Sequence, residues 1–312
     1  MKVVAVVVTY NRLNLLKECI AALKNQDYQD LEILIVNNNS NDGTEEYIKS
    51  VEDKKKVFLL SLEKNIGGAG GFHEGMRQAM RMQADWLWLM DDDTIPDRTS
   101  LSELCSATQV IKDKIGFLCS NVYGVKSECM NTPRMKFMER GDNGYADWNM
   151  HLEHSLVKVN TATFCSIMVS SDAVKYIGLP IKEYFIWGDD TEYTLRLSRY
   201  YGQGWLVGKS KVLHKRENGQ TLSIIKETNS NRIPVYFYYT RNYLVNLSLY
   251  FGYWASFAKT LHFNLMILKI LFGKSNYKWK KIKTLVKGIT AFWLRKYDVK
   301  SVKNRINNMG IV

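Results

Sequence analysis

The first 95 residues alternate short apolar runs with segments of helical periodicity. Four mostly apolar runs predict buried strands, at residues 3–8, 31–36, 57–62 and 86–90, and the first of them is continuous, as in a strand that is covered on both faces of a sheet. Between them, apolar side chains recur every three or four positions, as in residues 15–23 and 72–83, which predicts amphipathic helices. Strands and helices that alternate over short connections are typical of an α/β fold. We therefore expect a mostly parallel sheet with helices on both faces.

The alternation weakens after residue 96. Residues 116–122 and 162–170 favour strands, whereas residues 126–153 are polar and rich in loop-forming residues. From about residue 236 the pattern becomes helical and aromatic. We expect a domain at 1–220, with a first half at 1–95 and a second at 96–220, followed by a helical segment at 221–312. Ligands bind beyond the carboxyl ends of parallel strands, so the loops there are the expected location of a site.

Charge distinguishes the two ends of the chain. The 312 residues contain 43 Lys and Arg against 31 Asp and Glu, a net charge of +12. Residues 251–312 contain 13 of the bases and one acid, so residues 1–250 are neutral. Apolar and aromatic residues recur at helical intervals among these lysines, as in basic amphipathic helices that lie on anionic membranes. The alternative is that these helices pack on the body of the protein or on a second copy, which leaves a homo-oligomer open.

The cysteines and the N-terminus indicate the cellular compartment of the protein. The five cysteines show no CxxC pair and no zinc-site spacing, which favours free thiols in a reducing compartment. The apolar run at the N-terminus is too short for a signal peptide core, and no stretch approaches the roughly 18 apolar residues that span a bilayer. We expect a cytoplasmic protein that associates peripherally with the inner face of the cell membrane.

Three consecutive carboxylates, Asp91, Asp92 and Asp93, directly follow the fourth predicted strand. Carboxylates this close repel one another, so a cation is expected to offset them. Oxygen ligands suit Mn²⁺ or Mg²⁺, and two carboxylates leave coordination positions for a diphosphate. The alternative is a solvated acidic turn that caps a helix.

Three further segments carry candidate chemistry. The glycine-rich segment at residues 65–71 predicts either a close backbone approach to a ligand or merely a tight turn. The sequence WGDDTEY at residues 187–193 places paired carboxylates beside an aromatic ring, as general bases in sugar-binding sites often are, or else forms a capping box of Asp189 and Glu192. His214 ends a predicted strand, where its imidazole is either structural or a metal ligand.

These motifs together resemble a known family. VVVTYNR, IVNNNSNDGT, NIGGAGGFHEG, WLWLMDDDTIPD, WGDDTEY, VLHK and YYTRN occur in the order of the inverting glycosyltransferases of family 2, which have the GT-A fold. The resemblance covers about residues 1–245. Within that family the chain is most similar to bacterial galactofuranosyltransferases, with the dTDP-rhamnose enzymes as close relatives.

The resemblance implies roles for individual residues. A catalytic base is implied at Asp190, with Asp189 beside it. Acceptor contacts are implied at Trp187 and Glu192, and metal ligands at Asp91, Asp93 and His214. Donor binding is implied at Thr9, Tyr10, Arg12, Asn37, Asn39, Asn65, Gly67, Gly68, Gly71, Asp92 and Arg241.

The implied function is a metal-dependent inverting transfer of galactofuranose from UDP-galactofuranose onto a glycan or lipid-linked glycan, in cell-surface polysaccharide synthesis. Asn37 stands where the family usually has an Asp that contacts the nucleotide, which leaves the nucleotide open and keeps dTDP-rhamnose as an alternative donor. A nucleotidyltransferase and a basic nucleic-acid-binding protein are more remote alternatives. The neutral charge of residues 1–250 argues against nucleic acid as a partner.

Overall fold

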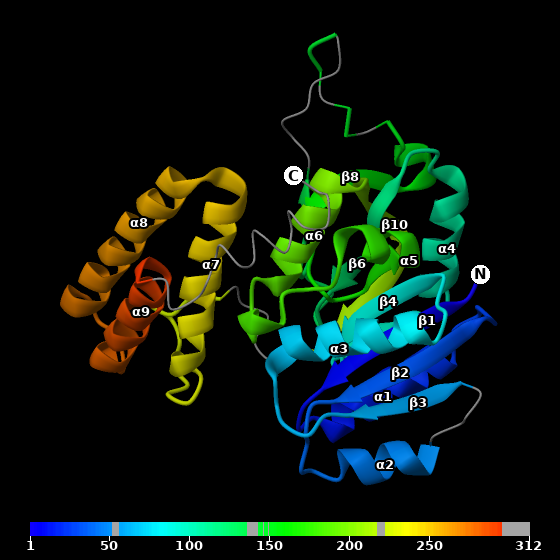
Figure 1. The fold of residues 1–312 in the computed structure, drawn as a ribbon, viewed down its shortest axis with the longest axis horizontal. Helices are drawn as coiled ribbons and strands as arrows, with labels where there is room; N and C mark the ends of the chain where they lie inside the picture. The colour runs from blue at the N-terminus through cyan, green and yellow to red at the C-terminus, as the bar shows by residue number, and fades with distance from the viewer. Residues whose placement is uncertain (52–55, 136–142, 146, 149, 217–221, 295–312) are drawn as a thin grey trace. The chain divides into compact units, whose positions relative to one another are not determined.

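The chain forms two compact units. The computed structural model describes residues 1–51, 56–135, 143–145, 147–148, 150–216 and 222–294. The first unit consists of Met1–Lys182 and Asp190–Gly219, and the second of Glu183–Asp189 and Gln220–Val312 (Figure 1). Along the chain, residues 183–189 therefore belong to the second unit, residues 190–219 to the first, and residues 220–312 to the second. Residues 295–312, which carry five bases of the predicted basic tail, lie outside the described residues.

The first unit is built on one mixed sheet. In the described residues its order is β3-β2-β1-β4-β9-β6-β10-β8-β7, with β5 paired to β10. Strands β1 to β4 run parallel, whereas β9 is antiparallel to β4 and β6, and β10 is parallel to β6. The strands are β1 Val3–Thr9, β2 Leu31–Asn37, β3 Val57–Ser61, β4 Trp86–Asp91, β5 Thr94–Pro96, β6 Ile115–Tyr123, β7 Arg134–Met135, β8 Leu156–Thr161, β9 Ile167–Ser170 and β10 Gln203–His214.

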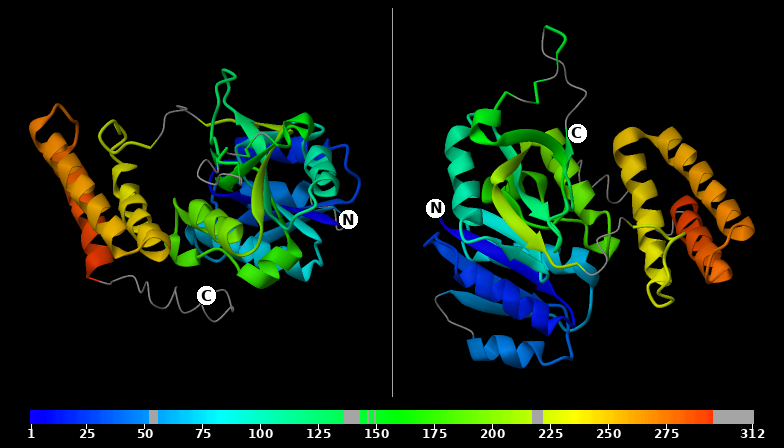
Figure 2. Two further views of the ribbon diagram at one scale, coloured as in Figure 1. Left: turned by 90° about the horizontal axis from the view of Figure 1, so that it is seen from above. Right: turned by 180° about the vertical axis from the view of Figure 1, so that it is seen from behind.

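Helices cover both faces of this sheet. Alternate side chains of β1, including Ala5 and Val7, share one core with Leu16 of α1 and Leu104 of α4. The other face of β1 packs against α3 (Figures 1 and 2). The helices of this unit are α1 Leu13–Lys24, α2 Thr44–Val51, α3 Gly67–Arg81, α4 Ser100–Val110, α5 Ser171–Ile177 and α6 Asp189–Tyr200, with short 3-10 helices at Leu152–His154 and Lys182–Tyr184. The expected α/β architecture is confirmed.

The glycine-rich segment is helical from Gly67, where a turn was one of the two expectations for residues 65–71. Asn65 Oδ1 accepts the Gly67 N–H at 2.8 Å, which starts the helix. A Cβ at Gly71 would lie 2.5 Å from Val8 Cγ1, and one at Gly75 would lie 2.5 Å from Val6 Cγ1. These glycines therefore let α3 pack directly on β1.

The described residues of the second unit form three helices that lie side by side, α7 Tyr236–Phe251, α8 Tyr253–Phe272 and α9 Lys278–Trp293 (Figure 2). A 3-10 helix at Ile233–Val235 precedes them. Buried Ser256 of α8 donates a hydrogen bond to the Leu244 carbonyl of α7 at 3.0 Å. Trp293 of α9 donates to Thr260 of α8 at 3.0 Å. Polar contacts thus connect α8 to both of its neighbours.

One expectation about α8 needs amendment. An 18-residue window of this 20-residue helix has a mean hydropathy of 1.2. By length and composition alone, α8 is therefore able to cross a membrane, whereas no membrane-spanning stretch was expected from the sequence. Only 22% of that window is buried. Lys259 and Lys269 lie within the helix.

The close packing of α3 on β1 and β2 generates a prediction about stability. The Gly75→Ala substitution places a Cβ against Val6 and Val36, at 2.5 and 2.7 Å. Because branched side chains in a packed sheet cannot move aside, we expect the free energy of unfolding to fall by about 1–3 kcal/mol. Urea denaturation measures this change.

Gly68→Ala is the matched control, because a Cβ there meets no atom within 4 Å. We expect it to raise the free energy of unfolding by about 0.5–1 kcal/mol, since alanine favours helix. Equal effects of the two substitutions would contradict the packing argument.

Candidate active site

The carboxyl ends of the parallel strands bring several predicted residues together. Thr9 ends β1 and lies opposite Asn37, the last residue of β2. Asp91 ends β4 and lies opposite Val8 of β1. His214 ends β10, where it pairs with Thr94 of β5, just beyond the three aspartates. Four strand ends therefore converge on one edge of the sheet.

Asp92 faces the protein interior. Its Oδ2 accepts a hydrogen bond from Thr9 Oγ1 at 2.8 Å, and its Oδ1 accepts one from Arg12 Nη1 at 3.2 Å. Burial raises the pKa of Asp92 to about 6, an effect that Arg12 opposes and Asp93 reinforces. Holding this carboxylate ionised therefore depends on the Arg12 cation.

Asp93 is also buried, but it has two cationic or polar neighbours. Arg12 Nη1 lies 2.7 Å from Oδ2, and His214 Nε2 lies 3.1 Å from Oδ1. Burial alone raises the pKa of Asp93, but His214 and Arg12 outweigh it and lower the pKa below its usual value. Arg12 thus bridges two adjacent carboxylates.

The nitrogen and oxygen atoms of His214 and Asp93 are of the kind that bind a divalent cation. His214 Nδ1 donates to the Asn131 side-chain oxygen at 2.8 Å, which directs Nε2 toward Asp93. Such a partner behind the imidazole is typical of metal-binding histidines. Asp93 Oδ1 is buried and accepts no well-aligned hydrogen bond within the described part of the chain, although His214 Nε2 lies 3.1 Å away. In that part, however, no three His, Cys, Asp or Glu side chains gather closely enough to form a metal site, and Asp91 is not grouped with Asp93 and His214.

Asn38 is a site residue that the sequence reasoning missed. It is buried, its Oδ1 accepts the Ile66 N–H at 2.9 Å, and its Nδ2 donates to the Gly67 carbonyl at 2.9 Å. It therefore fixes the loop after β2 against the beginning of α3. Its position within the run of three asparagines after the second strand was the available signal.

The other residues on this edge that were predicted to bind the sugar donor differ in exposure. Tyr10 is exposed, Asn39 is exposed with φ of 64°, and Gly68 is half-buried. Asn37 is buried, and its Oδ1 accepts the Ser40 N–H at 3.0 Å. The Asn37 side chain therefore shapes the loop after β2.

The second carboxylate cluster lies at the start of α6. Asp190 is half-buried, and its Oδ1 accepts the Thr191 N–H at 2.6 Å. Glu192 is fully buried, and its two oxygens lie 2.9 and 3.0 Å from Nε and Nη2 of Arg196. Arg196 also donates to the Ile177 carbonyl at 2.7 Å. Glu192 is thus paired with Arg196 inside the protein and has no exposed surface, whereas a contact with the acceptor was expected.

Three predicted residues, Trp187, Asp189 and Arg241, belong to the second unit. The ring of Trp187 packs edge-on against Tyr236, with ring centroids 5.1 Å apart. Arg241 Nη2 donates to the Glu183 carbonyl at 2.8 Å, whereas a contact with the donor diphosphate was expected.

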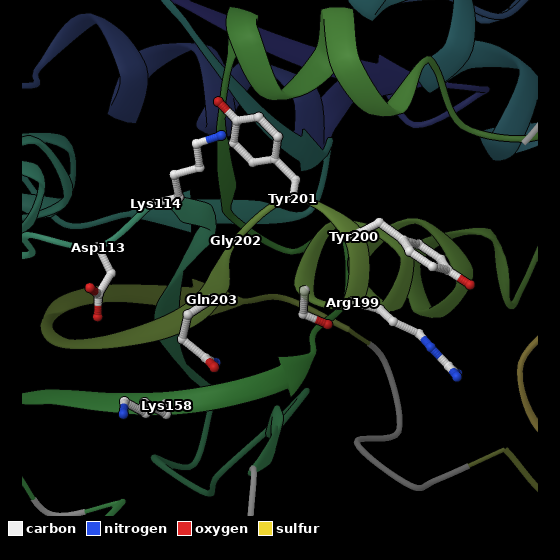
Figure 3. A pocket seen from close by; sticks show the side chains of 9 residues that line it. Asp113, Lys114, Lys158, Arg199, Tyr200, Tyr201, Gly202 and Gln203 are labelled. Carbon is white, nitrogen blue, oxygen red and sulfur yellow. The ribbon is translucent and has the colours of Figure 1, made fainter. Parts of the chain in front are cut away.

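A polar cavity of about 450 Å³ lies at the opposite edge of the sheet (Figure 3). Lys114 and Gln203 line it at the amino ends of β6 and β10. There the Lys114 amine approaches the ring of Tyr201, 5.3 Å from its centroid (Figure 3). Because β6 and β10 run in the same direction as β4, this cavity is distinct from the edge that carries the aspartates.

Sequence relatives are glycosyltransferases. The chain is 30% identical to the galactofuranosyltransferase GlfT1 of Mycolicibacterium smegmatis over 63% of this chain and 65% of the relative. It is 27% identical to GlfT1 of Mycobacterium tuberculosis over 63% of this chain and 64% of that protein. A beta-1,3-glucosyltransferase of Campylobacter jejuni that acts on GalNAc(5)-diNAcBac-PP-undecaprenol is 34% identical over 30% of this chain and 29% of its own. The chain thus spans less than two thirds of these relatives.

Solved structures share the fold. Residues 1–349 of S. aureus TarS, in complex with UDP-GlcNAc, match with a TM-score of 0.58 at 15% identity, over 99% of this chain and 84% of that one. GalNAc-T7 with UDP, GalNAc and Mn²⁺ matches with a TM-score of 0.58 at 15% identity, over 96% and 57%. Residues 4–173 match the family described as glycosyl transferase family 2. With the expected sheet and the predicted strand-end residues in place, the chain belongs to glycosyl transferase family 2.

Proposed function

We propose that this enzyme transfers galactofuranose from UDP-galactofuranose to a glycan or lipid-linked glycan acceptor, with inversion and with help from Mn²⁺ or Mg²⁺. The observation that carries the proposal is the pair Asp93 and His214 at the carboxyl edge of the sheet, 3.1 Å apart, in a family 2 chain. The donor sugar is supported by the galactofuranosyltransferases among the sequence relatives.

In this proposal Asp93 and His214 would hold the metal. A divalent cation supplies positive charge that stabilises a departing nucleoside diphosphate. Thr9 and Arg12 orient Asp92, and Arg12 offsets its charge. Asn38 and Asn65 hold the beginning of α3, whose N-terminal N–H groups favour an anionic ligand.

The proposed catalytic base is Asp190. It takes the proton of the acceptor hydroxyl while that oxygen bonds to the anomeric carbon of the donor sugar. The bond from this carbon to the diphosphate oxygen breaks, and its electron pair leaves with the diphosphate. The Thr191 N–H holds one carboxylate oxygen, which limits the orientations open to Asp190. Trp187, three residues earlier in the chain, is proposed to stack against the acceptor sugar.

The second unit is proposed to dock on an anionic lipid surface. Its α8 presents an apolar stripe at helical spacing, which we call the α8 stripe: Trp254, Phe257, Leu261, Leu265, Leu268 and Phe272, all exposed in the described structure. Residues 228–294 contain ten Lys and Arg and no Asp or Glu. Apolar side chains flanked by lysines fit the interface of an anionic bilayer.

The opposite side of α8 is already packed. Ser256, Thr260, Phe263 and Ile270 are buried in the second unit. A helix that is covered on one side by two other helices exposes only its remaining face to lipid, so we propose that α8 lies in the plane of the interface.

A donor screen tests the proposed substrate. Purified protein with Mn²⁺ and a glycan acceptor is incubated with UDP-galactofuranose, dTDP-rhamnose or UDP-glucose, and release of nucleoside diphosphate is measured. We expect the fastest release from UDP-galactofuranose, by at least about tenfold. Faster release from dTDP-rhamnose would replace the proposed sugar, and release from none of the donors would contradict it.

Asp190→Asn tests the base. Because an amide cannot accept the proton, we expect kcat to fall by at least about 100-fold, with donor affinity by calorimetry unchanged. Asp172→Asn is the control, since Asp172 is an exposed aspartate that pairs with Lys175. Full activity of Asp190→Asn would exclude it as the base.

Vesicle sedimentation tests the lipid surface. We expect the double variant Leu261→Ser, Leu265→Ser to bind phosphatidylserine vesicles at least about tenfold more weakly, because two apolar side chains no longer leave water. Val125→Ser with Leu152→Ser is the control, since both side chains are exposed in the first unit. Unchanged binding would exclude the α8 stripe, and retention after an alkaline carbonate wash would exclude the in-plane arrangement.

A further inference from the structure

The segment Glu183–Asp189 precedes Asp190 in the chain and has an unusual backbone. Phe185 and Trp187 have φ of 65° and 61°, and Gly188 has φ of 93°. Side chains other than glycine adopt this left-handed region only under strain, which surrounding contacts must maintain. Two such residues within three positions therefore require a strong local constraint.

Three side chains of α7 provide that constraint. Buried Asn242 donates from Nδ2 to the carbonyls of Tyr184, Ile186 and Trp187, at 3.0, 3.1 and 2.7 Å. Arg241 Nη2 donates to the carbonyls of Glu183 and Tyr184, at 2.8 and 3.2 Å. We call Arg241, Asn242 and Asn246 the α7 clamp.

Asn246 extends the clamp to the end of the segment. Its Nδ2 donates to the Gly188 carbonyl at 2.9 Å, and its Oδ1 accepts the Tyr184 hydroxyl at 2.6 Å. Five carbonyls between Glu183 and Gly188 thus accept hydrogen bonds from α7.

The clamp is itself oriented. Arg241 Nε donates to Asn242 Oδ1 at 2.9 Å, which turns the amide so that its nitrogen faces the segment. The guanidinium also lies over the rings of Phe237 and Tyr238, 5.4 and 5.2 Å from their centroids. Arg241 is 9% exposed, so these contacts are shielded from water.

We propose that the α7 clamp positions the acceptor side of the active site. It holds Phe185–Gly188 in one strained conformation, and this fixes the backbone of Trp187. The proposal rests on the proposed function, in which Trp187 stacks against the acceptor sugar. Arg241, Asn242 and Asn246 are positioning residues, because each acts on the segment rather than on substrate.

Asn242→Asp is the sharpest test variant. Aspartate has the same shape and keeps the oxygen that accepts from Arg241, but it replaces the donor with an oxygen that faces three carbonyls. Ser256→Ala is the matched control, because it removes one buried hydrogen bond, which α8 donates to α7, and leaves the segment untouched. Asn246→Ala, which removes only the Gly188 and Tyr184 contacts, serves if Asn242→Asp does not fold.

Amide hydrogen exchange across residues 183–190 tests the clamp without any substrate. We expect exchange at least about tenfold faster in Asn242→Asp or Asn246→Ala than in Ser256→Ala, since lost hydrogen bonds favour local opening. Equal exchange in the clamp variants and the control would overturn the proposal. This measurement judges the clamp even if the wild type transfers no sugar, an outcome that would contradict the proposed function alone.

Kinetics distinguish positioning from stability. For the clamp variants we expect kcat/KM for the acceptor to fall by about 100-fold while the stoichiometry and affinity of donor binding by calorimetry stay unchanged. Arg241→Lys, which keeps a charged donor, is expected to retain more activity than Arg241→Met. A loss of kcat matched by an equal loss of donor-binding sites would show unfolding and overturn the positioning role.

Discussion

The carboxylates at the end of β4 are the constraint on which the site depends. Asp92 and Asp93 are adjacent and buried, and ionised carboxylates so placed require compensating charge. Arg12 bridges both, Thr9 donates to Asp92, and His214 lies against Asp93. Thr9 lies in β1, Arg12 follows β1, and His214 lies in β10. The charges of the two carboxylates are therefore compensated only when these parts of the chain have come together in the folded sheet. The proposed divalent cation would offset the same charge that the Arg12 guanidinium offsets, which would connect the stability of this edge to its proposed chemistry.

The second unit belongs to the proposed mechanism as well as to the proposed membrane contact. Segment Glu183–Asp189 is grouped with α7 to α9, although the residues on either side of it belong to the first unit. Asn242 is fully buried and donates to three carbonyls of this segment. The helical unit that presents the α8 stripe therefore also holds the backbone that leads to Asp190.

The sequence predicted the four parallel strands and the convergence of their ends, because continuous apolar runs followed by polar loops report burial directly. It did not predict that the Gly71 region is helical, since close packing on Val8 depends on a neighbour distant in sequence. The ion pair of Glu192 with Arg196 was also missed, because two opposite charges four residues apart in a sequence do not show whether the pair is buried. The role of Arg241 in the α7 clamp depends on a strained backbone that composition does not encode.

We propose that the edge formed by Asp93 and His214 binds a nucleoside diphosphate together with a divalent cation. The most direct measurement is the affinity of the purified protein for UDP by calorimetry, with Mn²⁺ and with Mn²⁺ removed by a chelator. We expect Mn²⁺ to strengthen UDP binding by at least about tenfold, because each ligand raises the affinity for the other. Equal UDP affinity in the two conditions would contradict it.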